Sequence, residues 1–126
     1  MPEASFSYAV LRVVPRVERG ESMNVGVVVF SRQHDFLGMR AELDGARLAA
    51  LAPDCDPAPI RERLAALEVV VAGDGDGGTL AALPPSDRFG WVTAPSSTVI
   101  QPSPVHTGMT DDPRATLDHL FRTLVA

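Results

Sequence analysis

The sequence predicts an α+β protein, an antiparallel sheet of four to five strands with two or three helices packed on it. Three β-forming runs follow one another between residues 5 and 43, and their short connections favour antiparallel pairing. Two later segments, around residues 60–71 and 113–125, repeat apolar residues at helical spacing. With 126 residues, 45% hydrophobic and 21% charged, the chain is long enough for a buried core, and we expect a single domain over residues 1–126.

The first predicted strand covers residues 6–15 and ends at Pro15. Apolar side chains alternate onto both of its faces, which favours a central position in the sheet. Arg12 is the exception, because it places a charge within this otherwise buried pattern.

Two more strands complete a predicted meander. In the strand at residues 24–30, Gly26 suggests a bulge or the close approach of another group. Residues 31–35 form a turn, and the strand at 36–43 alternates an apolar face with a face carrying Arg40 and Glu42.

Helices are expected in the middle of the chain. Asp44 can cap a short helix, and Asp56 followed by Pro57 can begin a longer one. Residues 73–79 (GDGDGGT) read as a flexible loop. Their aspartates resemble the start of a calcium loop, but Pro85 stands where that motif requires its last glutamate.

The last third is predicted to contain two extended segments and a helix. Residues 88–94 and 97–105 read as strands whose prolines favour sheet edges. Asp112 and Pro113 begin the final helix, which carries a single apolar stripe.

Charge is unevenly distributed around a net of −5. Residues 41–87 carry three arginines and nine acidic side chains, which argues against broad nucleic-acid binding. All eleven basic residues are arginine. Codon usage in a GC-rich genome would explain this bias, and so would a preference for the planar guanidinium group, which grips carboxylates and phosphates.

The sequence also limits location and cofactors. The N-terminus lacks a signal-peptide pattern, no apolar run is long enough to span a membrane, and Cys55 is the only cysteine, so we expect a cytoplasmic protein. Neither a phosphate-binding loop nor a dinucleotide-binding fingerprint occurs, and the absence of lysine excludes Schiff-base chemistry. The three histidines lack metal-ligand spacing, so we expect no cofactor and no metal.

The first candidate site is the segment between the first two strands. Arg12, Arg16 and Arg19 lie near Glu21 and Asn24, and a loop that folds back would bring the guanidinium groups to one anion. The alternative is a solvated hairpin with internal salt bridges. Spacing alone leaves both interpretations open.

The second candidate site surrounds His106 and Thr107. These residues are expected to shape a turn or to line a polar pocket. A hydrolase that uses His106 with Ser96 and Ser97 is an alternative, although the sequence has no G-x-S-x-G nucleophile motif.

The segment RGESMNVGVVVF, together with FLGMR and the closing SPVHTGMTDDPRATLDHLFRTLV, resembles the bacterial proteins of the DUF3037 family over residues 6–125. The most specific positions are an Arg-Gly-Glu step at residues 19–21 and Asn-Val-Gly at residues 24–26. Met23 stands where the family more often has valine.

The resemblance implies no activity, because the family has none assigned. It does imply a partner: members are often encoded beside a kinase-like protein that resembles the toxin half of persistence modules. The leading hypothesis is therefore a non-enzymatic accessory or interaction domain paired with a kinase-like protein. The alternative is an anion- or nucleotide-binding protein that uses the arginines.

Overall fold

The structure is a computed structural model that describes residues 2–96 and 98–126. Within these residues, one antiparallel sheet contains β1 (Ala4–Val13), β2 (Met23–Ser31), β3 (Phe36–Ala41), β4 (Ile100–Pro102) and β5 (His106–Thr110). The helices are α1 (Gly45–Leu51), α2 (Pro57–Ala72), α3 (Gly78–Ala81), α4 (Pro85–Val92) and α5 (Pro113–Leu124), with a short 3-10 helix at Gly75–Gly77. The α+β class is confirmed, but the described residues form five α-helices instead of two or three.

The predicted meander is confirmed, because β1, β2 and β3 are consecutive antiparallel neighbours. The other side of β1 pairs with β4 and then with β5, so β1 is central, as its two apolar faces predicted. At the break between β4 and β5, the backbone nitrogen of Ser103 donates to the Val10 carbonyl at 2.7 Å. The Ser103 hydroxyl accepts from the Val10 nitrogen at 2.9 Å. The two short strands therefore act as one interrupted edge of the sheet.

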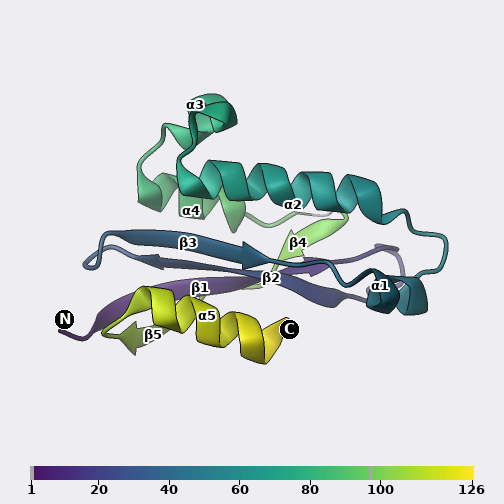
Figure 1. Ribbon diagram of the computed structural model, residues 1–126, viewed down its shortest axis with the longest axis horizontal. Helices are drawn as coiled ribbons and strands as arrows, with labels where there is room; N and C mark the ends of the chain where they lie inside the picture. Colours follow the sequence, from purple (N-terminus) through teal and green to yellow (C-terminus); the bar gives the residue numbers. More distant parts are fainter. Residues whose placement is uncertain (1, 97) are drawn as a thin grey trace.

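Helices cover both faces of the sheet (Figure 1). The larger core layer lies under α2 and α4 and includes Leu11, Val28 and Leu64. The smaller layer lies under α5 and includes Val27, Val29, Leu117 and Phe121. Helix α5 packs against β2 and β3.

Capping side chains begin the helices where the sequence predicted. Asp44 Oδ1 accepts from the backbone nitrogen of Ala46 at 3.0 Å, and Asp56 Oδ1 accepts from that of Ala58 at 3.0 Å. These contacts satisfy N–H groups that have no partner inside the helix.

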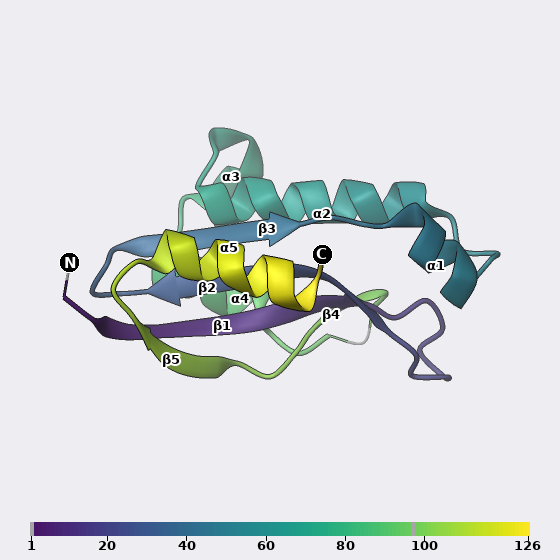
Figure 2. The same ribbon diagram turned by 60° about the horizontal axis from the view of Figure 1, so that its bottom comes forward.

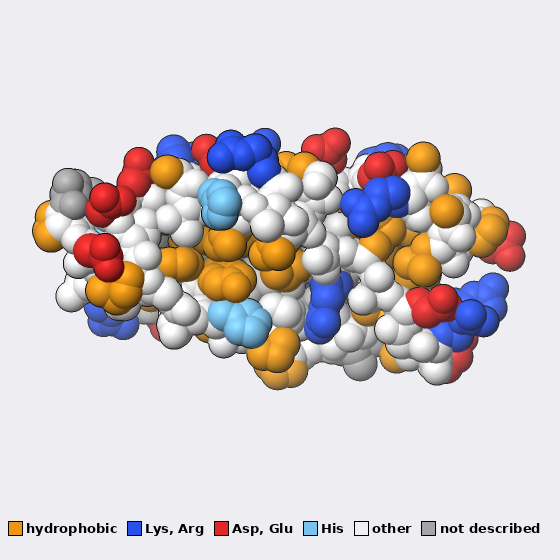
Figure 3. Space-filling model, turned by 90° about the horizontal axis from the view of Figure 1, so that it is seen from below, with side chains coloured by type: hydrophobic (Ala, Val, Ile, Leu, Met, Phe, Trp, Pro, Cys, Tyr) orange, Lys and Arg blue, Asp and Glu red, His pale blue; other side chains and the backbone are white. Residues whose placement is uncertain are grey.

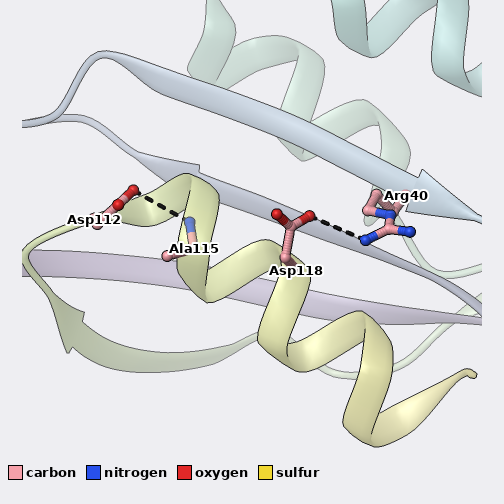
Figure 4. A network of polar contacts seen from close by, with 4 residues as sticks. All are labelled: Arg40, Asp112, Ala115 and Asp118. Carbon is pink, nitrogen blue, oxygen red and sulfur yellow. Dashed lines mark hydrogen bonds and ion pairs between the residues drawn. The ribbon is translucent and has the colours of Figure 1, made fainter.

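Helix α5 is fixed by a cap and by an ion pair (Figure 4). Asp112 Oδ1 accepts from the backbone nitrogen of Ala115 at 3.2 Å. Arg40 Nη1 on β3 lies 3.1 Å from Asp118 Oδ1, and the Arg40 guanidinium covers the Phe121 ring at 4.2 Å from its centroid. The Asp112 cap fixes the start of α5, and the two contacts of Arg40 hold one side of α5 against β3.

The expectation for Gly26 is confirmed. The register of β1 and β2 shifts between Leu11 and Arg12, which pair with Gly26 and Asn24. A Cβ at Gly26 would also lie only 3.1 Å from the Arg40 carbonyl oxygen. A bulge and a close backbone approach therefore coincide at this glycine.

The strand predicted for residues 88–94 is wrong, because residues 88–92 belong to helix α4. Its aromatic and β-branched residues suggested a strand, but Pro85 starts a helix whose Phe89 and Val92 are both buried three residues apart. The Phe89 ring packs on Phe30 with centroids 5.5 Å apart. Of the strand predicted for 97–105, only Ile100–Pro102 forms one, and Ser97 lies outside the described residues.

Two loop predictions are also wrong. Residues 73–79 were expected to be a flexible loop, but Asp74 caps a 3-10 turn by accepting from the Asp76 nitrogen at 3.0 Å, and α3 follows. His106 and Thr107 were expected to shape a turn or to line a polar pocket, and the turn is wrong because both residues belong to strand β5. Gly108 pairs with Phe6, whose ring occupies the space that a side chain at 108 would need.

Candidate functional site

Three of the predicted site residues meet at a hollow beside the β1–β2 loop. Arg16, Arg19 and Glu21 line it together with the end of α1 and the residues after it, and its volume is about 260 Å³. The loop turns tightly, because the Arg16 carbonyl accepts from the nitrogens of Arg19 at 3.0 Å and Gly20 at 3.2 Å. Gly20 has a φ of 71°, in the left-handed region that favours glycine.

The charges at this hollow partly cancel. Arg19 Nε forms an ion pair with Glu21 Oε1, and this hydrogen bond, followed by the charge of Glu21, raises the pKa of Arg19. The side chain of Arg16 makes no hydrogen bond or ion pair within residues 2–96 and 98–126. The C-terminal end of α1 adds partial negative charge. The hollow therefore offers an anion one uncompensated cation, not three.

Arg12 lies elsewhere, on β1, and is half buried. Its Nη2 donates to the Pro102 carbonyl at 3.4 Å. Its buried Nε has no hydrogen-bond partner within the described residues. Arg12 does not line the hollow, so the structure does not bring it together with Arg16 and Arg19 there.

Asn24 has a structural contact at the end of α5. Its Nδ2 donates to the Leu124 carbonyl at 3.0 Å, and Arg47 Nη1 donates to the Val125 carbonyl at 3.1 Å. Carbonyls at a helix C-terminus lack partners inside the helix, so these two side chains complete α5.

His106 and Thr107 are neighbours on β5 whose side chains point to opposite faces of the sheet. The His106 ring packs on Tyr8 with centroids 5.3 Å apart, on the face that carries α5. Thr107 pairs with Ser7 and is exposed. Ser96 hydrogen-bonds Thr98 at 2.8 Å, and Ser97 lies outside the described residues, so the hydrolase hypothesis gains no geometric support.

A second candidate surface lies beside α5. The helix covers β2 and β3, while β1 and β5 extend past it to one side (Figure 2). Thr116 Oγ1 lies 2.6 Å from Thr110 Oγ1, so the side of α5 that carries Leu120 and Leu124 faces β1 and β5. We call the surface formed by Tyr8, Val10, Arg12, His106, Leu120 and Leu124 the Tyr8 face.

The Tyr8 face is mainly apolar and incompletely covered. Tyr8, Leu120 and Leu124 are only partly buried against the smaller core layer, and Val10 is half buried. Figure 3 views this side of the molecule and shows hydrophobic side chains gathered at its middle with histidines at their border. Alternation along β1 places Tyr8, Val10 and Arg12 on one strand face, but no sequence pattern indicates that α5 leaves this part of the face open.

Two further findings concern ions and membranes. Among residues 2–96 and 98–126, no three His, Cys, Asp or Glu side chains gather where they could hold a metal ion. No helix in the same ranges is long and apolar enough to cross a bilayer.

The comparisons with known proteins identify a family. The model of a protein family of unknown function, DUF3037, matches residues 8–125. No curated protein and no solved structure matches the chain. The match covers nearly the whole length, including the Arg19–Glu21 turn and the β5–α5 segment on which the resemblance was based, and the chain therefore belongs to the DUF3037 family.

Proposed function

We propose that this chain is a non-enzymatic protein-interaction domain that docks its partner on the Tyr8 face. The observation that supports this most is the position of α5, which covers β2 and β3 and leaves the apolar side chains of β1 partly open. A surface of this kind on a folded domain marks a binding site more often than chance exposure does.

The residue types on the Tyr8 face suit a protein partner. Tyr8 offers a large apolar ring with a polar tip, and Arg12 offers a half-buried guanidinium. Tyrosine and arginine are enriched among the residues that dominate binding energy at interfaces. His106 and Arg12 surround apolar Val10, which gives the surface an apolar centre with a polar border.

The partner that we propose is the kinase-like protein expected from the family resemblance. The Tyr8 face carries Arg12 and His106 and no carboxylate, so an acidic or neutral surface with a central apolar side chain would complement it. No reaction is assigned to the chain itself in this proposal.

The test is a calorimetric titration of the chain with the kinase-like protein encoded beside it. We expect binding that Tyr8→Ala and His106→Ala each weaken, Tyr8→Ala by about tenfold or more. Val17→Ala is the matched control, because Val17 is 50% exposed but lies in the β1–β2 loop. The proposal is overturned if no binding occurs, or if the control weakens binding as much as Tyr8→Ala.

The second candidate function is anion binding at the Arg16–Arg19 hollow. It is favoured by Arg16, whose guanidinium has no partner within the described residues and lines a hollow of about 260 Å³. Stabilisation by inorganic phosphate or ATP in a thermal-shift assay would support it if Arg16→Ala removed the effect. Arg32→Ala is the control, because Arg32 is an exposed arginine in the β2–β3 turn. Stabilisation that survives in Arg16→Ala rules out this site.

A further inference from the structure

We propose that the outer edge of β5 pairs with the β5 of a second copy of this chain, which would join two sheets into one across a twofold axis. The inference is independent of the proposed function, because it depends on the backbone edge of β5 and not on the Tyr8 face. Three observations carry it: the backbone groups that point outward, the absence of charge within β5, and a twofold register in which no like charges face each other.

The first observation concerns the hydrogen bonds that β1 makes with its outer neighbours. Val10 bonds with Ser103, and the Val14 nitrogen donates to the Val99 carbonyl at 2.6 Å, so even-numbered residues of β1 point toward β4 and β5. Tyr8 pairs with His106, Phe6 with Gly108 and Ala4 with Thr110. Backbone groups alternate in direction along a strand, so those of Thr107 and Met109 point away from β1. No described strand pairs with them.

The second observation is that β5 itself carries neither a charged residue nor a proline, since Pro102 and Pro104 both precede it. Residues 98–110 contain no Asp, Glu, Lys or Arg. Met109 is 60% exposed and Val105 is 45% exposed. Edge strands that must stay unpaired usually carry charges, especially lysine, or are covered by other elements.

The opposite edge of the sheet shows the contrast. Strand β3 carries Arg40 and is preceded by Asp35 and followed by Glu42. It also packs against α2 on one face and α5 on the other. One edge of the sheet is therefore guarded by charge and helices, whereas the β5 edge is not.

The third observation is that a second copy of β5 can pair with this edge in a twofold register. An antiparallel pair centred on Gly108 would place Thr107 opposite Met109 of the second copy, and Met109 opposite its Thr107, so that the outward backbone groups meet. Met109 would then be covered. Asp111 would lie opposite Val105 of the second copy and not opposite another carboxylate, so no like charges would face each other.

Gly108 suits the position on the twofold axis. It has no side chain, and the Phe6 ring already fills the space above it, with Cε1 2.7 Å from where a Cβ would lie. Gly108 itself therefore adds no side chain at the axis, and the Phe6 rings hold each β5 in register with its own β1.

The experiment is sedimentation equilibrium of the full chain over a wide concentration series, without any partner protein. We expect the average mass to rise from that of one chain to that of two. Thr107→Pro removes an outward N–H without removing a bond to β1, and Met109→Lys places a charge on the edge. We expect each variant to remain at the mass of one chain at concentrations where the original sequence is dimeric.

Two controls keep the result decisive. Val17→Lys adds the same charge at a residue 50% exposed in the β1–β2 loop and should leave the dimer unchanged. Circular dichroism and the Tm show whether each variant is folded. If Thr107→Pro unfolds the chain, the mass of the folded Met109→Lys variant decides whether β5 forms the dimer contact.

Three outcomes would overturn the inference: a single-chain mass at every concentration, a dimer that persists in folded Met109→Lys, or a dimer that Val17→Lys also dissociates. Protection of the β5 amides from hydrogen exchange only in a one-to-one complex with the kinase-like protein would assign this edge to that protein instead. Tyr8→Ala should weaken partner binding without changing the dimer, so the inference and the proposed function fail separately.

Discussion

Ser103 replaces a missing strand residue opposite Val10 by using both its backbone and its side chain. Its nitrogen donates to the Val10 carbonyl at 2.7 Å, and its hydroxyl accepts from the Val10 nitrogen at 2.9 Å. The ladder of β1 therefore continues across the gap between β4 and β5 without an unpaired backbone group at Val10.

Ser103→Ala should lower the free energy of unfolding by about 1–3 kcal/mol, because the Val10 N–H loses its acceptor in a half-buried place. Urea denaturation followed by circular dichroism measures the change. Ser96→Ala is the control, because Ser96 is exposed and, among the residues that the structure describes, hydrogen-bonds only Thr98, and it should stay within about 0.5 kcal/mol. Equal effects of the two substitutions would contradict the role given to Ser103.

Arg40→Ala should destabilise the fold more than Asp118→Ala does. Both variants lose the exposed ion pair, which contributes about 0–1 kcal/mol. Only Arg40→Ala also uncovers the Phe121 ring, a contact that adds about 0.5–1 kcal/mol. Denaturation at low and high salt separates the two contributions, because salt screens the ion pair. A larger loss in Asp118→Ala would show that the pair, and not the ring contact, holds α5 to β3.

Gly38→Ala and Gly90→Ala should change stability in opposite directions. A Cβ at Gly38 would lie 2.7 Å from Phe36 Cζ and 3.0 Å from Leu117 Cδ2, so we expect a loss of about 1–3 kcal/mol. Gly90 lies within α4 with nothing within 4 Å of its Cβ position, so alanine should stabilise by about 0.5–1 kcal/mol. Thermal unfolding of both variants tests the pair, and a stabilised Gly38→Ala would mean that Phe36 moves aside freely.

Gly20→Ala should cost about 1–2 kcal/mol through backbone conformation alone. Its φ of 71° is unfavourable for alanine, although nothing lies within 4 Å of the Cβ position. Gly75→Ala is the matched control, since Gly75 is equally open and has no positive φ. Comparable Tm values for the two variants would show that the loop relaxes around alanine and does not need glycine.

Glu68→Gln should remove part of the dependence of stability on pH. Burial raises the pKa of Glu68, so the folded state binds this proton more tightly than the unfolded chain does. The group therefore lowers stability as pH rises from its ordinary pKa of about 4.3 through the raised value in the folded state. We expect the variant to match the original at acidic pH and to exceed it at pH 7. Glu62→Gln, at another exposed glutamate of the same helix, is the control, and an equal gain there would refute the assignment.

The parts of the fold that the sequence predicted best are those where a local signal agreed with the tertiary packing. Asp112 and Pro113 predicted the start of α5, and the alternation of side chains along residues 6–43 predicted the meander. Phe89 and Val92 led to the wrong prediction of a strand at residues 88–94, because aromatic and β-branched residues favour strands locally. Only a helix buries both side chains against the sheet, since they are three residues apart.

The candidate site was predictable only in part. The Arg19–Glu21 step indicated a charged turn, and Arg16 does join it at one hollow. The partial exposure of Arg12 on the Tyr8 face depends on how far α5 extends over the sheet, which no pattern within residues 6–30 encodes. Strand β5 was missed because it is short, polar and contains Gly108, and its pairing with β1 spans about a hundred residues of sequence.

That last separation has a consequence for biosynthesis. β1 leaves the ribosome long before β4, β5 and α5, which supply its outer neighbours and cover the smaller core layer. Until then, the nascent chain exposes one unpaired edge of β1 and the valine side chains of β2 that α5 later covers. Such a surface is prone to aggregate with other chains. A product that stops before residue 100 should therefore demand chaperone protection or fall to proteolysis.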